Sequence, residues 1–294
     1  MNNPNIGVLG GDARYIHLAN ALSRDGYEVH CMFLDSPRLA RGVHRAEDFR
    51  DALPFCAALL LPTPVCGQGL ELNAPYWPQD RNRDIGQFLG DIGKTALVLG
   101  GAFSPAVKAA FAAKELRFID LMERDDLAAA NALPTAEGAV AMAMEQMEIT
   151  LSGSRSCVVG CGRCGRVLAR LLAAMGSRVT VTARRPGQLT WIADQGWTPL
   201  ETGRLAQGAG EWDVVFNTVP APVVDRRVLD ALGPGAVVID LASRPGGTDF
   251  LYAAQRGITA VLAPGLPGKV APKTAGLILR DTILPILRER GISV

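Results

Sequence analysis

The sequence has few aromatic residues, few histidines and almost no net charge. Of its 294 residues, 6% are aromatic and three are histidine, and the formal net charge is +1 at pH 7. Because nucleic-acid-binding proteins usually carry a basic stripe with stacking aromatic rings, this composition indicates no nucleic acid as a partner. No apolar run is long enough to span a bilayer, and the residues after Met1 lack the pattern of a secretory signal. We therefore expect a cytoplasmic protein without a membrane segment.

Six cysteines in a chain of this length indicate no disulfide framework. Cys161 and Cys164 form a C-x-x-C pair, but the chain has no second pair of this spacing. Both cysteines occupy variable positions of a glycine turn, where a metal or a disulfide would compete with phosphate for the same backbone. We interpret the spacing as coincidental and expect no metal site, with a metal or redox pair as the alternative.

The glycine turn contains Gly160, Gly162 and Gly165 in a G-x-G-x-x-G pattern. A short apolar strand (157–159) precedes it, helical spacing of apolar residues (167–175) follows, and a second strand (178–182) completes a βαβ unit. In such a unit the first glycine permits a tight turn, the second admits a pyrophosphate, and the third allows helix and strand to pack closely. The pattern predicts a dinucleotide site to which Arg163 also contributes. A purely structural glycine turn is the alternative.

The second strand of this unit ends at Ala183, Arg184 and Arg185. An NAD enzyme commonly places Asp or Glu here to accept a hydrogen bond from the ribose 2′-hydroxyl. Guanidinium groups cannot accept that bond, but they suit a 2′-phosphate. We therefore predict NADP(H) as the cofactor and keep NAD(H) as the alternative, in which both arginines are merely solvated.

Apolar strands alternate with helices along the whole chain, which is typical of parallel sheets. Residues 6–33 open another βαβ unit, but it lacks the third glycine of a dinucleotide turn. The predicted fold class is α/β, with two doubly wound domains. We expect a substrate or partner domain at 1–133, joined by a final helix at 272–294, and a Rossmann domain at 134–271.

Polar residues follow the later strands of the Rossmann domain. Asn217, Thr218, Val219 and Pro220 end one predicted strand, at the sheet edge where the nicotinamide half of the cofactor would lie. A proline- and glycine-rich loop at 62–86 follows a strand of the first domain. Long ordered loops are usually functional, and a surface excursion is the alternative.

Three further motifs make the sequence recognisable. They are residues 10–14 (GGDAR), residues 123–127 with 131–139 (ERDDL and NALPTAEGA), and residues 265–276 (GLPGKVAPKTAG). Together they resemble the dipicolinate synthase A-chain family over nearly the whole chain. The resemblance implies an arrangement similar to formate/glycerate dehydrogenases, two doubly wound domains with a cleft between them.

The resemblance also implies an activity and partners. Members make dipicolinic acid during sporulation, so we expect an NADP-dependent oxidoreductase that acts on a CH–CH or CH–NH group and oxidises dihydrodipicolinate. The flavoprotein-like B-chain of dipicolinate synthase is the implied partner, and we also expect a homo-oligomer.

A dicarboxylate substrate needs cations and hydrogen-bonding groups. We expect it to be bound by Asp12, Arg14, Thr135, Lys269 and Lys273. Glu137 and Lys269 are the candidate catalytic residues, with Glu137 as the base. In the alternative, Thr135 caps a helix that starts at Ala136, and Glu137 only favours the first turn of that helix.

The histidines exclude one rival reaction. Oxidation of 2-hydroxy acids on this fold usually needs a histidine base in or after the nucleotide domain, but His17, His30 and His44 all lie near the N-terminus. Two alternatives remain. One is an NADP enzyme that resembles shikimate dehydrogenase, and the other is a non-catalytic subunit that binds NADP(H) and supports its partner.

Overall fold

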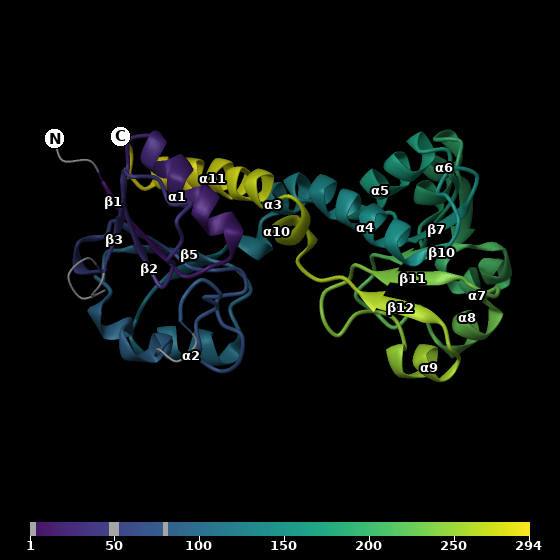
Figure 1. The fold of residues 1–294 in the computed structure, drawn as a ribbon, viewed down its shortest axis with the longest axis horizontal. Coiled ribbons are helices and arrows are strands. Elements are labelled where there is room, and N and C mark those ends of the chain that lie inside the picture. The colour runs from purple at the N-terminus through teal and green to yellow at the C-terminus, as the bar shows by residue number, and fades with distance from the viewer. Residues whose placement is uncertain (1–3, 47–52, 79–81) are drawn as a thin grey trace. The chain divides into compact units, whose positions relative to one another are not determined.

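The computed structural model describes residues 4–46, 53–78 and 82–294. The chain forms two compact units, each with its own six-stranded sheet (Figure 1). The first unit consists of Met1–Ala130 together with Ala271–Val294, and the second of Asn131–Val270. All strand pairs are parallel, which confirms the predicted α/β class.

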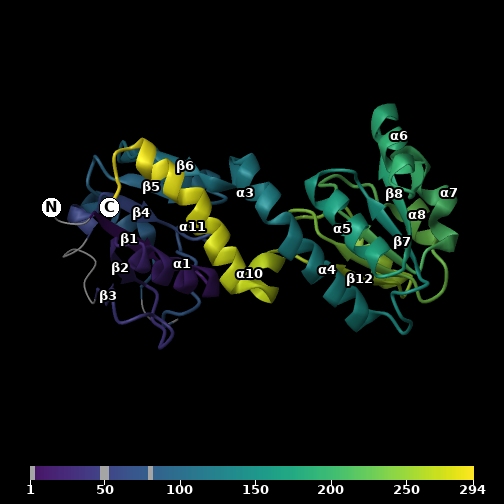
Figure 2. The same cartoon turned by 90° about the horizontal axis from the view of Figure 1, so that it is seen from above.

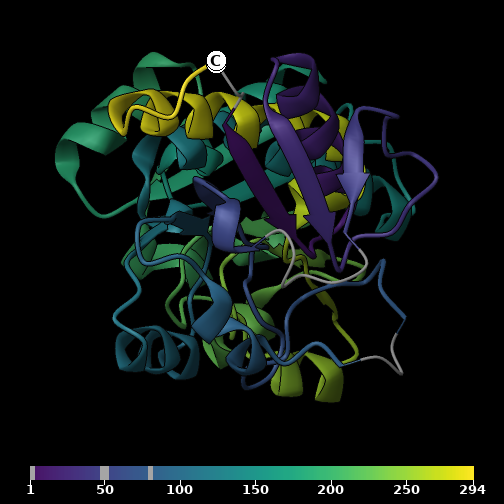
Figure 3. The same ribbon diagram turned by 90° about the vertical axis from the view of Figure 1, so that its left-hand side faces the viewer.

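The sheet of the first unit has the strand order β3-β2-β1-β4-β5-β6. Its strands are β1 (Asn5–Leu9), β2 (Glu28–Met32), β3 (Val43–Arg45), β4 (Ala58–Leu60), β5 (Leu97–Gly100) and β6 (Phe118–Asp120). Its helices are α1 (Ala13–Arg24), α2 (Pro105–Ala113), α3 (Asp125–Ala130) and α11 (Pro272–Glu289). Figure 3 shows the purple strands β1, β2 and β3 lying side by side. Since β1 and β4 are neighbours, the loops that follow them diverge at this point of the sheet, where ligands of doubly wound folds bind.

Two apolar layers cover this sheet. One contains Leu18 and Leu22 of α1, with Leu279 and Ile283 of α11. Figure 2 shows α11 running beside α1, and the two helices pack closely enough that a Cβ atom at Gly276 would lie 2.5 Å from the carbonyl oxygen of Arg14. The C-terminal helix thus belongs to the core of the first unit, although it is far from α1 in sequence.

Helix α11 continues through Pro285 as a single helix. Proline cannot donate the backbone hydrogen bond to the residue four positions earlier, which here is Asp281. Both residues are exposed, so water can satisfy the carbonyl group of Asp281. No helix in the described part of the chain is both long and apolar enough to cross a bilayer.

The sheet of the second unit has the order β12-β11-β10-β7-β8-β9. Its strands are β7 (Arg155–Val159), β8 (Arg178–Ala183), β9 (Thr198–Glu201), β10 (Val214–Asn217), β11 (Val237–Asp240) and β12 (Thr259–Leu262). Its helices are α4 (Ala132–Gln146), α5 (Arg163–Ala174), α6 (Pro186–Asp194), α7 (Leu205–Gly208), α8 (Arg226–Ala231), α9 (Phe250–Gln255) and α10 (Leu266–Val270). Strands β7 and β10 are neighbours in this sheet, and the loops that follow them diverge from each other. The glycine turn follows β7, so it lies where a dinucleotide fold binds its ligand.

Candidate functional site

The glycine turn joins β7 to α5 and requires glycine at two positions. Gly160 has φ +105°, in the left-handed region that favours glycine. A Cβ atom at residue 160 would lie 2.6 Å from the hydroxyl oxygen of Thr218, and one at Gly165 would lie 2.0 Å from the carbonyl oxygen of Gly160. The close approach of turn, strand and helix therefore excludes any side chain at either position.

Gly162 differs because its backbone is extended, with φ −83° and ψ −169°. It is the N-cap of α5, and a Cβ atom there would meet no other atom within 4 Å. The open space lies over the first turn of α5, where helical N–H groups lack partners within the helix and the dipole favours anions. These residues fit a pyrophosphate, which would use the space that a Cβ atom at Gly162 would fill. Arg163 is the exposed first residue of α5.

Side chains from neighbouring strands and helices brace the turn. The N–H of Gly160 donates to the hydroxyl of Thr182 (3.2 Å), which also accepts a hydrogen bond from Thr202 (3.3 Å). Arg166 donates to the carbonyl oxygen of Cys161 (3.1 Å), and its guanidinium lies over the ring of Trp191 at 4.5 Å. These contacts hold the turn in its shape.

The two cysteines of the turn are free thiols. Burial raises the pKa of Cys164 to about 11, so this thiol is protonated at neutral pH and is a poor metal ligand or nucleophile. Across residues 4–46, 53–78 and 82–294, no cluster of His, Cys, Asp and Glu side chains could hold a metal ion.

A cavity of about 400 Å³ opens beside the carboxyl ends of β8, β9 and β10. Its lining residues are Arg184, Thr202, Gly203, Arg204, Leu205, Ala206, Gln207, Pro222, Val223, Asp225, Arg227 and Val228. Ala183 is the buried last residue of β8, and Arg185 does not line the cavity. The sequence did not indicate Arg204 and Arg227 as candidate binding residues. No local pattern identifies them, because their position depends on β9 lying beside β8 in the sheet.

The predicted nicotinamide segment shapes its own loop. Asn217 is fully buried, accepts a hydrogen bond from the N–H of Val219 (3.0 Å) and donates to the carbonyl of Val219 (3.1 Å). The hydroxyl of Thr218 donates to the carbonyl of Val159 (2.9 Å). Pro220 is exposed. The loop is therefore tied to β7, and Thr218 lies against Gly160 of the glycine turn.

The loop after β11 is organised by a carboxylate that the sequence did not single out. Asp240 is fully buried and accepts hydrogen bonds from the N–H groups of Ala242 (2.9 Å) and Gly247 (2.8 Å) and the hydroxyl of Thr248 (2.7 Å). Gly247 and Thr248 also line a cavity of about 610 Å³ near the start of α8. A buried carboxylate with three donors holds this strand end rigidly.

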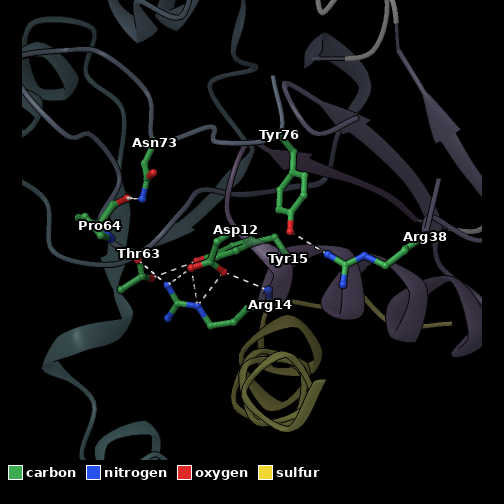
Figure 4. A network of polar contacts seen from close by, with 8 residues as sticks. All are labelled: Asp12, Arg14, Tyr15, Arg38, Thr63, Pro64, Asn73 and Tyr76. Atoms are coloured by element: carbon green, nitrogen blue, oxygen red, sulfur yellow. Dashed lines mark hydrogen bonds and ion pairs between the residues drawn. The ribbon is translucent and has the colours of Figure 1, made fainter. Parts of the chain in front are cut away.

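In the first unit, two predicted substrate-binding residues bind each other (Figure 4). Asp12 is the N-cap of α1, and its carboxylate accepts hydrogen bonds from the guanidinium Nε (2.9 Å) and Nη2 (2.9 Å) of Arg14. Arg14 also donates to the carbonyl oxygen of Thr63 (2.7 Å). The side chain of Arg14 is only 13% exposed, so much of its charge is already neutralised by Asp12.

Further polar groups lie near this pair, on α1 and on the loops after β2 and β4. The hydroxyl groups of Tyr15 and Thr63 are 3.1 Å apart, and burial raises the pKa of Tyr15 to about 12. Arg38 donates to the hydroxyl of Tyr76 (2.8 Å), as Figure 4 shows. Tyr76 belongs to the loop predicted at 62–86. The sequence did not indicate Arg38 as a candidate binding residue, because its position depends on how the loops after β2 and β4 pack together.

Lys273 lies exposed in the first turn of α11. Burial, and then the positive charges of Arg38, Lys273 and Arg24, lower the pKa of His17 on α1. Three cationic side chains therefore lie near His17 on this part of the first unit.

The structure corrects the predicted start of α4. The helix begins at Ala132 with Asn131 as its N-cap, so Thr135 does not cap it and Glu137 is not in its first turn. The hydroxyl of Thr135 instead donates to the carbonyl of Asn131 (2.7 Å). The alternative in which Glu137 only stabilises the start of the helix was therefore wrong, because the helix starts earlier than the cap pattern suggested.

Glu137 and Lys269 lie on two helices that pack together in the second unit. A Cβ atom at Gly138 of α4 would lie 3.1 Å from Leu266 and Val270 of α10. Glu137 and Lys269 are both exposed. The structure thus places Thr135, Glu137 and Lys269 in the second unit, and Asp12, Arg14 and Lys273 in the first.

Two doubly wound sheets, one with a glycine turn that fits a dinucleotide, are the architecture of the nicotinamide-dependent dehydrogenase class. Residues 126–246 match the family model of the D-isomer specific 2-hydroxyacid dehydrogenase NAD binding domain, and residues 5–122 match that of the N-terminal domain of the dipicolinate synthase A-chain. The chain belongs to the dipicolinate synthase A-chain family, which confirms the resemblance in its motifs.

Relatives support this assignment over the full length. The chain is 34% identical to the dipicolinate synthase A-chain of Bacillus subtilis (strain 168), covering 97% of this chain and 96% of the relative. The crystal structure of the dipicolinate synthase A-chain from Bacillus halodurans is 35% identical, with a TM-score of 0.90 and 97% of each chain covered. A transhydrogenase from Sinorhizobium meliloti (16% identity, TM-score 0.71, 97% of this chain and 94% of that chain) shares the fold alone.

Proposed function

We propose that this chain is the dehydrogenase subunit that oxidises dihydrodipicolinate to dipicolinate with NADP⁺, in the cytoplasm of a sporulating cell and together with the flavoprotein-like B-chain. The observation that carries the proposal is full-length similarity to a protein named as the A-chain of dipicolinate synthase. The braced glycine turn supports the cofactor part, because it fits a pyrophosphate.

The reaction removes one hydride and one proton from the dihydropyridine ring, and the product is aromatic. Bound NADP⁺ would supply the hydride acceptor. Since aromatisation favours the products, orienting the ring matters more than strong acid–base catalysis. The chain therefore has three tasks, which are to hold the cofactor, to bind two carboxylates and to accept a proton.

The second unit would hold the cofactor. We assign the pyrophosphate to the backbone at Gly160, Gly162 and Arg163, where Gly165 lets α5 approach. Arg184 would bind the 2′-phosphate, and the loop Asn217–Pro220 would border the nicotinamide. Each of these groups lies at the same edge of one sheet.

Cationic groups would bind the substrate carboxylates. Lys269 and Lys273 are exposed and available for this role, whereas Arg14 would first have to exchange Asp12 for the substrate. Glu137 is our candidate for the proton acceptor, since it is an exposed carboxylate on a helix fixed by packing at Gly138.

One observation favours a second candidate, a non-catalytic subunit that binds NADP(H). The pairing of Asp12 with Arg14 occupies one of the expected carboxylate-binding cations. Such a subunit needs the glycine turn and Arg184 but no dicarboxylate clamp.

The test is to mix the purified chain with enzymatically generated dihydrodipicolinate and NADP⁺, with and without the B-chain. NADPH absorbance and chromatographic detection of dipicolinate are the two readouts. NADPH formation by the chain alone supports the dehydrogenase. Turnover by the B-chain alone overturns it, and absence of NADPH formation unless the B-chain is present favours the non-catalytic role. As a matched pair, Lys269→Met should raise KM for the substrate about tenfold, whereas exposed Lys108→Met should not.

A further inference from the structure

The cavity beside β8, β9 and β10 has an apolar wall and a charged rim. Leu205, Ala206, Pro222 and Val223 form much of the wall, and its volume of about 400 Å³ is within the range of sites for small ligands. An adenine ring suits such a wall, since it has two apolar faces. The rim carries Arg184, Arg204 and Arg227.

The three arginines differ in how far their charges are already used. Arg227 pairs with Asp225 (3.0 Å), and Asp225 also accepts the N–H of Val228 as the cap of α8. Arg204 has only a long contact with Glu201 (3.8 Å), and the side chains are 63% and 61% exposed. Such exposed pairs are weak. Within the part of the chain that the structure describes, the guanidinium of Arg184 has no hydrogen bond or ion pair. Two guanidinium groups are thus available for an anion.

The cavity lacks the group that would select a ribose 2′-hydroxyl. Among the described residues, the only carboxylate that lines it is Asp225, which pairs with Arg227 and accepts the N–H of Val228 as the N-cap of α8. A free carboxylate would be needed to accept a hydrogen bond from the hydroxyl, whereas two guanidinium groups favour a phosphate.

The cavity is also tied to the glycine turn. Thr202 lines the cavity and donates to Thr182, which accepts the N–H of Gly160. The buried side chain of Thr182 therefore joins the cavity rim to the glycine turn by two hydrogen bonds. A single extended ligand that binds both places needs them held at a constant separation.

We propose that Arg204 acts with Arg184 as the clamp for the 2′-phosphate of NADP(H), that Glu201 competes only weakly with the phosphate for Arg204, and that Arg185 takes no part. This inference rests on the proposed NADP-dependent function and adds a specificity residue to it. Arg204 lies in the 3₁₀ helix η6 (Thr202–Arg204) after β9, one strand further out than the turn in which dinucleotide folds commonly read the ribose.

The test measures binding of 2′,5′-ADP and of 5′-AMP to the full-length chain by titration calorimetry, because these two probes differ only in the 2′-phosphate. Arg184→Met and Arg204→Met should each weaken 2′,5′-ADP about tenfold and leave 5′-AMP within about twofold. Arg185→Met is the matched control and should change neither probe. Glu201→Gln should tighten 2′,5′-ADP about twofold to threefold, since it removes the competing carboxylate.

The outcomes separate this inference from the proposed function. If wild type prefers 2′,5′-ADP but Arg204→Met binds it normally, the clamp is overturned and NADP dependence stands. If wild type binds both probes equally, the NADP preference itself fails. These side chains are exposed, so circular dichroism should show each variant folded, and loss of 5′-AMP binding in a folded Arg204→Met variant would also overturn a phosphate-specific role.

Discussion

The carbonyl oxygen of Gly160 lies 2.0 Å from the point where a Cβ atom of residue 165 would stand. The helix after the turn can therefore approach β7 only because residue 165 is glycine. Gly162, three residues earlier, faces open space instead. One turn thus contains a glycine needed for packing and a glycine that leaves room for a ligand.

Alanine substitutions should separate these two roles. Gly165→Ala should lower the free energy of unfolding by about 1–3 kcal/mol, because the added methyl group forces the helix away from the turn. Gly162→Ala should leave stability within about 0.5 kcal/mol but weaken the dinucleotide about tenfold or more, because its methyl group fills the pyrophosphate space. Urea unfolding and cofactor titration measure the two effects. Unchanged cofactor affinity in Gly162→Ala would show that the pyrophosphate does not bind in the space at Gly162.

The ion pair of Asp12 and Arg14 should stabilise the first unit. Asp12→Asn keeps a side chain that caps α1 but removes the charge opposite a guanidinium that is 13% exposed. We expect a loss of about 1–2 kcal/mol in the free energy of unfolding, less than for a fully buried pair because Asp12 is 32% exposed. Thermal unfolding with Asp35→Asn as an exposed control would check this. Equal midpoints would mean that solvent already screens the pair.

Asp240 should be needed for the loop after β11. Asp240→Asn replaces one acceptor by a donor that faces the N–H of Gly247 and the hydroxyl of Thr248. We expect the free energy of unfolding to fall by about 2–4 kcal/mol, since buried donors lose their partner. The matched control is Asp194→Asn at the exposed end of α6. Hydrogen exchange at the N–H of Gly247 would locate the effect, and unchanged protection there would contradict it.

Acid should destabilise the protein through His30. The rings of His30 and His44 stack with centroids 5.0 Å apart on adjacent strands. Burial, and then the charge of His44, lower the pKa of His30, while Glu28 opposes both. Below about pH 6.5 the unfolded chain then binds more protons than the folded chain, so stability falls as pH falls.

The measurement is the difference in Tm between about pH 7.5 and about pH 5.5. His44→Gln should reduce this difference, because it removes the neighbouring charge. His17→Gln is the comparison, because His17 also has a lowered pKa but lies on α1 away from the stacked pair. If His44→Gln leaves the difference unchanged, the stacked pair does not set the pH dependence.

The sequence by itself determined the fold class, the glycine turn and the family. Alternating apolar periods and glycine positions are local properties, so they predict parallel strands and a tight turn without knowledge of distant contacts. The NADP preference, the substrate-binding residues and the base stay predictions.

Only the tertiary structure decided which polar groups meet. The sequence offered Arg14 as a free cation, but the turn before α1 brings the Asp12 carboxylate to it. It missed Arg204, because the cavity depends on β9 lying beside β8, and it missed Asp240, whose partners fold back from the following loop. It also started α4 at Ala136 instead of Ala132. A pairing depends on which strand ends are adjacent and how loops fold back, and neither is encoded in local periodicity.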